Sequence, residues 1–306
     1  MFSFIRKNSF ILLLLLLFVL SDLLISRWDP MAHSRRFYKN DFTKTLFHHN
    51  WQDTGPVFFG NSAVTASYIE EQSTHKLTEF GLSYGKITDL KQILAHPWYH
   101  VESELVVGID VHTMMDAMET DPTYQWHKKW YQPYIYAYRD YFRDSGKEFA
   151  RNLYAGVVEL NRDKLLAYEP RWIDKELYYG NQSDQWLQDK WDDYDKRFGW
   201  MTTEDFRGNL DALEWVVKYA AAHDLHLKVV WMPWNKAYPL PPYMPALKDE
   251  ANRILAAGNV PVFDVMDRYD PKLFHDLVHL NRHDGAPIFT REVDAWLNSF
   301  ASSAKP

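Results

Sequence analysis

The alternation of short apolar runs with helical stretches is the feature that most narrows the fold of this chain. Runs at residues 57–59, 77–80, 105–107, 225–232 and 260–265 have the length and composition of buried strands. Stretches with helical spacing lie between and after them, at residues 63–72, 84–95, 202–223, 244–257 and 287–300. Because strands that alternate with helices form a parallel sheet covered on both faces, the sequence predicts an α/β protein of three layers.

Small and polar residues directly follow three of these apolar runs. Ser62 follows the first run, Gly81 the second, and Gly108 and Asp110 the third. The carboxyl ends of parallel strands lie at one edge of the sheet, where α/β proteins bind their ligands. We therefore expect these residues to meet at that edge and to form the functional site.

The alternation stops between about residues 121 and 200, where Trp, Tyr and charged residues are abundant. We predict a mostly helical insertion there, rather than a separate domain. Its aromatic residues, with Trp126 and Trp130 as the leading candidates, would either line a glycan groove or serve in packing or in docking on a membrane partner. Trp234 follows the fourth apolar run, so it would either border the site or pack in the core.

The N-terminus has the pattern of an export segment. Arg6 and Lys7 precede an apolar stretch that runs to Ile25 with one polar interruption. No small residues suited to cleavage follow, so an uncleaved signal anchor over residues 1–26 is favoured over a signal peptide. A stalk over 27–55 and a domain over 56–306 would then follow. With the basic residues held inside, the domain would face outward from the cell membrane, or be secreted if the segment is cleaved.

Composition excludes several classes of function. The 306 residues carry a formal net charge of -7 and no run of basic residues, which argues against a nucleic-acid partner. The absence of cysteine excludes disulfides, thiolate metal sites and cysteine nucleophiles. No motif calls for a cofactor.

Ser62 lies where a strand gives way to a helix, which suits a nucleophile. Backbone N–H groups at the start of a helix can stabilise the oxyanion that such a serine creates. The same position also suits a plain helix cap made by Asn61 or Ser62. A serine nucleophile needs a base and a group that orients the base. Asp276 and His279, three residues apart after the fifth apolar run, are our candidates for these two roles.

Histidines near the C-terminus offer an alternative interpretation. His275, His279 and His283 are spaced four residues apart and would share one face if the segment were helical, as metal ligands can. The polar residues around Gly285 make a continuous helix unfavourable, so we predict no metal.

The order Gly60-Asn61-Ser62, Gly81, Gly108-Ile109-Asp110 and Asp276-x-x-His279 resembles the SGNH (GDSL-like) hydrolase superfamily. Together with the N-terminal segment, it is most similar to the branch that contains DltD and the polysaccharide O-acetylation proteins. The resemblance covers about residues 56–115 and 202–300. It implies a flavodoxin-like parallel sheet carrying a Ser-His-Asp site.

The resemblance also implies a role for each residue of the site. Ser62 would be the nucleophile, His279 the general base and Asp276 its partner. The N–H groups of Ser62 and Gly81 would bind the oxyanion, with Asn61 and Gly108 beside them. The family has Asn where this chain has Asp110, and an ionised Asp cannot donate a hydrogen bond. Asp110 therefore has another task, or is protonated, or the oxyanion hole is built differently.

The activity that the resemblance implies is transfer of an acyl group, most simply acetyl, to a cell-surface polysaccharide through an acyl-serine. A membrane-bound O-acyltransferase partner would deliver the acyl group across the membrane. A carbohydrate esterase of the same fold is the first alternative. The second is a non-catalytic polysaccharide-binding or assembly protein, which the altered block at Asp110 favours.

Overall fold

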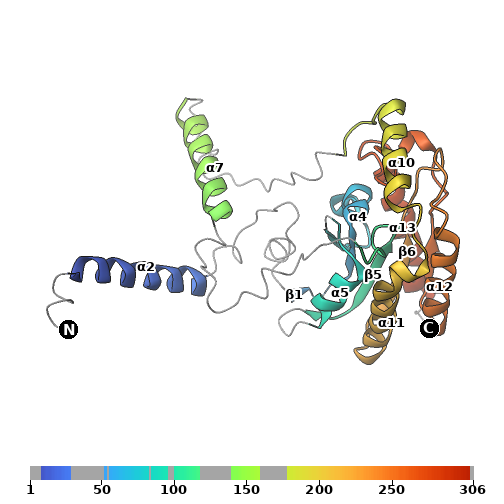
Figure 1. Ribbon diagram of the computed structural model, residues 1–306, viewed down its shortest axis with the longest axis horizontal. Helices are drawn as coiled ribbons and strands as arrows, with labels where there is room; N and C mark the ends of the chain where they lie inside the picture. The colour runs from blue at the N-terminus through green and yellow to red at the C-terminus, as the bar shows by residue number, and fades with distance from the viewer. Residues whose placement is uncertain are drawn as a thin grey trace. The chain divides into compact units, whose positions relative to one another are not determined.

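A computed structural model describes residues 8–28, 52–53, 55–82, 84–95, 100–117, 139–158 and 178–303 (Figure 1). The chain divides into two compact units. One unit comprises residues 1–36 and 124–171, and the other comprises residues 37–123 and 172–306. The second unit contains the predicted sheet.

Five parallel strands form this sheet in the order β3-β2-β5-β6-β7. The strands are β2 (Val57–Asn61), β3 (Thr78–Leu82), β5 (Glu104–Ile109), β6 (His226–Trp231) and β7 (Val262–Asp264). Each contains part of one predicted apolar run, so the structure confirms the parallel α/β sheet. A separate parallel pair, β1 (Gln52–Asp53) with β4 (His100–Val101), was not predicted.

Helices cover both faces of the sheet. They are α4 (Ser62–Ser67), α5 (Ile87–Leu94), α11 (Arg207–Ala222), α12 (Met244–Ala257) and α13 (Gly285–Ser303). The connection after β2 runs toward one edge of the sheet, and the later connections run toward the other. Because such crossovers are right-handed, α4 lies on one face and α5, α11 and α12 lie on the opposite face. Observed packing agrees, since α13 contacts α4 while α11 contacts α5 and α12.

Two predicted helices differ in detail from the observed ones. The helix predicted over 63–72 ends at Ser67, because Tyr68 adopts an extended conformation, and a short 3-10 turn, η1 (Glu70–Gln72), follows. The helix predicted over 202–223 begins with the 3-10 turn η2 (Thr203–Phe206) before α11. A third turn, η3 (Pro271–Leu273), precedes the loop that carries His279.

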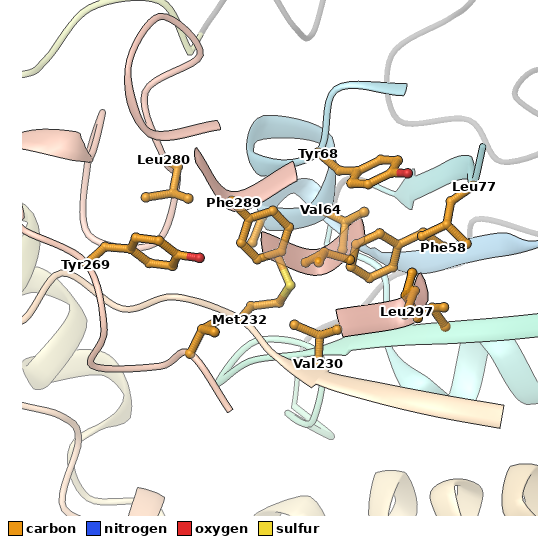
Figure 2. Close-up of a cluster of buried hydrophobic side chains, with 14 of the residues drawn as sticks. Phe58, Val64, Tyr68, Leu77, Val230, Met232, Tyr269, Leu280, Phe289 and Leu297 are labelled. Atoms are coloured by element: carbon orange, nitrogen blue, oxygen red, sulfur yellow. The ribbon is translucent and has the colours of Figure 1, made fainter. Parts of the chain in front are cut away.

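The apolar core on the α4 side fixes the position of this helix against the sheet. Phe58 and Val230 from the strands meet Val64 of α4 and Phe289 of α13 (Figure 2). Gly108 permits the close approach, since a Cβ there would lie 2.6 Å from Val64 Cγ2. The first turn of α4, which contains Ser62, therefore rests on a rigid layer.

The expected insertion contributes to both units. Helix α10 (Asp184–Phe198) belongs to the sheet unit, whereas α7 (Arg139–Val158) belongs to the unit that contains α2 (Ser9–Trp28). Large apolar side chains of α2 are exposed from Phe10 to Leu24. A search of the described residues found no helix with the length and apolar character needed to cross a bilayer. Trp126 and Trp130 lie outside the described residues, as do residues 1–7 of the predicted anchor and 29–51 of the predicted stalk.

Candidate active site

Ser62 is the first residue of α4, directly after β2. Asn61 caps the helix, because its Oδ1 accepts a hydrogen bond from the backbone N–H of Ala63 at 2.8 Å. The Ser62 hydroxyl is therefore not needed as the cap. It lies at the edge of the sheet between β2 and β5, whose following connections run to opposite faces, and ligands of α/β proteins bind at such a point.

His279 comes to this edge on a tight loop rather than on a helix. Phe274 and Leu280 form an isolated antiparallel bridge, and the N–H of His275 donates to the carbonyl of His279 at 2.7 Å. Within the loop, Asp276 Oδ1 accepts hydrogen bonds from the N–H groups of Val278 and His279 at 2.9 and 2.8 Å. Such turns are typical of Asp. They bring Asp276 and His279 face to face.

The three side chains form a continuous line at hydrogen-bond distance. His279 Nε2 lies 2.9 Å from Ser62 Oγ, and His279 Nδ1 lies 2.7 Å from Asp276 Oδ2. The carboxylate favours the tautomer with the proton on Nδ1, which leaves Nε2 to accept the proton of the serine hydroxyl. This arrangement can activate Ser62 as a nucleophile.

The carboxylate of Asp276 stays ionised well below neutral pH. Burial by itself raises the pKa of Asp276, but the charge and hydrogen bond of His279 and the two backbone N–H groups outweigh burial and lower the pKa to about 2. A permanently charged Asp276 can stabilise the imidazolium that forms when His279 takes the serine proton.

Contacts outside the predicted set hold the two halves of the site together. Arg282, which is buried, donates from Nη1 to the carbonyls of Thr65 and Tyr68 at 2.7 and 3.3 Å, so it joins the histidine loop to α4. Tyr178 stacks on the imidazole of His279, with ring centroids 4.4 Å apart. The only sequence feature that pointed to Tyr178 was the aromatic stretch before α10. No sequence feature pointed to Arg282.

A pocket of about 610 Å³ opens beside this line of side chains. One wall is α10, which presents Trp186, Lys190 and Arg197 on one face. The same helix adds Asp193, Tyr194 and Phe198, and elements distant in sequence complete the lining with Asn61, Ser62, Thr65, Tyr84, His112, Tyr178, Trp234, Asp276, Leu277, Val278 and His279. The pocket therefore gives Ser62 a binding surface rich in aromatic rings.

Asp110 has a different place from the one that the family pattern suggested. Its buried carboxylate accepts hydrogen bonds from Asn61 Nδ2 at 2.8 and 2.9 Å and from the N–H groups of His112 and Thr113 at 2.9 and 2.8 Å. Burial alone raises the pKa of Asp110, but His112 and these donors outweigh it and lower the pKa well below its usual range. Asp110 is thus an acceptor that holds Asn61, which is a task other than donating a hydrogen bond to an oxyanion.

The two predicted glycines also lie away from the pocket lining. The N–H of Gly81 donates to Glu79 Oε1 at 3.1 Å, so it is not directed at a ligand, and the expected oxyanion role does not fit. Gly108 is buried inside β5 against Val64. Of the predicted oxyanion donors, the Ser62 N–H is the one that lies beside the nucleophilic hydroxyl. It is available to a ligand because the first N–H groups of a helix have no partner within the helix.

The remaining predicted residues have structural contacts. Trp234 lines the pocket, but it is 3% exposed and its Nε1 donates to the carbonyl of Tyr238, so it forms part of the floor. His275 Nδ1 pairs with the carbonyl of Gly180 at 2.8 Å, and His283 lies against Tyr179. Among the described residues, no group of three His, Asp or Glu side chains is placed to hold a metal ion.

Comparisons of the chain with protein-family models, with curated proteins and with solved structures gave no match. The geometry of the pocket therefore carries the functional inference.

Proposed function

We propose that this protein is an extracytoplasmic O-acyltransferase of the SGNH type, which moves an acyl group, most simply acetyl, to a cell-surface polysaccharide through acyl-Ser62. The observation that carries the proposal is the line from Ser62 through His279 to Asp276 at 2.9 and 2.7 Å, beside an open pocket. An alcohol, an imidazole and a carboxylate in this order are what covalent acyl transfer requires.

In the proposed reaction, His279 Nε2 takes the proton of Ser62 while Oγ attacks the carbonyl carbon of the acyl donor. Asp276 stabilises the imidazolium, and the proton then passes to the leaving group. A sugar hydroxyl next attacks the acyl-serine, gives its proton to His279, and releases Ser62. The N–H of Ser62 is the proposed donor to the oxyanion in both steps.

The walls of the pocket support a glycan as the acceptor. Trp186 of α10 is partly exposed in the pocket, and Tyr84 is 54% exposed. Exposed aromatic rings of this kind stack on the apolar faces of sugars. Attachment to the membrane through the N-terminal segment and delivery of the acyl group by a membrane-bound O-acyltransferase remain parts of the proposal.

The test uses the purified full-length chain and 4-nitrophenyl acetate. We expect release of 4-nitrophenol and an acetyl adduct on the peptide that contains Ser62, and we expect Ser62→Ala to lower the rate by about 10³-fold or more. Ser299→Ala, on α13 outside the pocket lining, is the matched control and should keep the full rate. A rate that Ser62→Ala does not change would favour a binding or assembly role instead.

A further inference from the structure

His112 lies in the same pocket as Ser62 and His279, but the proposed steps do not use it. It follows β5, two residues after Asp110, and its side chain is 19% exposed. The ring lies edge-on to Tyr194, with centroids 5.4 Å apart and planes at 86°. The pocket thus contains a second imidazole whose orientation is fixed by packing.

Asp110 contacts both this imidazole and Asn61, the residue before the nucleophile. Its Oδ2 lies 3.9 Å from His112 Nδ1 and also accepts the hydrogen bond of Asn61 Nδ2 at 2.9 Å. Asn61 directly precedes Ser62 and caps its helix. The Asp110 carboxylate therefore holds His112, whose backbone N–H donates to Oδ1 at 2.9 Å, as well as the turn that carries Ser62.

The same carboxylate favours one tautomer of His112, and the tautomer determines which ring nitrogen can accept a hydrogen bond from a ligand. A negative charge beside Nδ1 favours the tautomer with the proton on that atom and leaves the lone pair on Nε2. In the part of the chain that the structure describes, no partner of Nε2 is found. Nε2 can therefore accept a hydrogen bond from a hydroxyl group in the pocket.

We propose that His112 forms the acceptor subsite of the pocket, where its Nε2 accepts a hydrogen bond from a hydroxyl of the sugar that receives the acyl group. The inference rests on the proposed function. The sugar oxygen bonds to the acyl carbon as the bond from that carbon to Ser62 Oγ breaks. The proton of the attacking hydroxyl passes to His279 Nε2 and from there to Oγ. His112 holds the sugar in place and takes no proton.

This assignment predicts a selective loss of transfer. His112→Phe keeps a ring beside Tyr194 but removes both nitrogens, while His112→Gln restores a polar group that can accept from a hydroxyl. With 4-nitrophenyl acetate as donor and methyl glycosides of glucose, galactose and mannose as acceptors, we expect acetylated glycoside from the unchanged chain. In His112→Phe, the loss of transfer should exceed the loss of Ser62 acetylation by about tenfold, the effect of one hydrogen bond.

Two further variants make the result specific. His112→Gln should recover part of the transfer and lower the KM for the glycoside relative to His112→Phe. His223→Phe is the matched control, because His223 also stacks on a tyrosine, Tyr219, with centroids 3.9 Å apart, but does not line the pocket. It should transfer as the unchanged chain does.

The outcomes separate the subsite from the proposed function. If His112→Phe and His112→Gln lose Ser62 acetylation and transfer in equal proportion, His112 only supports the fold and the subsite is wrong. If the unchanged chain forms acetyl-Ser62 but passes the acetyl group to water alone with every glycoside, the subsite is wrong while the serine chemistry stands. If Ser62 is never acetylated, the proposed function fails, and the subsite fails with it.

Discussion

Asp276 performs two tasks with its two carboxylate oxygens. Oδ1 accepts the N–H groups of Val278 and His279 and so shapes the loop, while Oδ2 faces His279 Nδ1. The substitution Asp276→Asn separates these tasks. Asn can keep the turn through its carbonyl oxygen, but its amide group would face Nδ1 and favour the tautomer that cannot accept the serine proton.

We therefore expect Asp276→Asn to lower kcat for ester cleavage by about 10³- to 10⁴-fold while the protein remains folded. The measurements are the rate with 4-nitrophenyl acetate and the thermal unfolding temperature of both proteins. Retention of more than about a tenth of the rate would show that Asp276 does not orient the base.

At the scale of elements, the contact between β3 and α4 determines where Ser62 lies. A Cβ on Gly81 would overlap Thr65 Oγ1 and would lie 2.7 Å from the backbone nitrogen of Thr65. Backbone cannot yield as a flexible side chain can, so Gly81→Ala should push α4 away from β3. We expect a loss of about 1–3 kcal/mol in the free energy of unfolding, together with lower activity, as measured by urea unfolding and ester cleavage.

Gly146→Ala on α7 is the control for this change, because a Cβ there would meet nothing within 4 Å. Alanine is the better residue inside a helix, so this variant should lose no stability and can gain about 0.5–1 kcal/mol in its helix. Equal destabilisation by both substitutions would contradict the proposed role of the β3–α4 contact.

For the whole molecule, the sequence predicted the parallel sheet because its signals are local: each apolar run and each following helix is visible in its own window. It also predicted that Ser62 and His279 meet although they are 217 residues apart, because each follows a predicted strand and the carboxyl ends of parallel strands lie at one edge. The contacts of Arg282 with α4 were beyond prediction, since no pattern in the sequence marks an arginine that will donate to backbone carbonyls of a distant helix. The sequence left the task of Asp110 open, because its partner Asn61 lies 49 residues away on the neighbouring strand.

Acid stability is a property of the whole molecule that follows from the two hydrogen-bonded carboxylates of Asp110 and Asp276. The pKa of Asp276 is lowered to about 2 and that of Asp110 lies well below its usual range, whereas both titrate near 3.9 in the unfolded chain. A lowered pKa in the folded state stabilises the protein above about pH 4, and this stabilisation is lost as the pH falls from about 5 toward 2. Asp276 alone contributes about 2–3 kcal/mol on this scale.

We expect the free energy of unfolding, measured with urea, to fall steeply between pH 6 and pH 3. Asp110→Asn should be less stable than the unchanged chain at pH 6, because the amide has one oxygen in place of two for the donors around it. The difference in the free energy of unfolding between the two proteins should narrow at pH 3. At that pH Asp110 is mostly protonated in the unfolded chain, so the carboxylate stabilises the folded state less. Since other titrating groups are common to both proteins, their contributions largely cancel in the difference. A gap of the same size at both pH values would mean that the charge of Asp110 does not stabilise the fold.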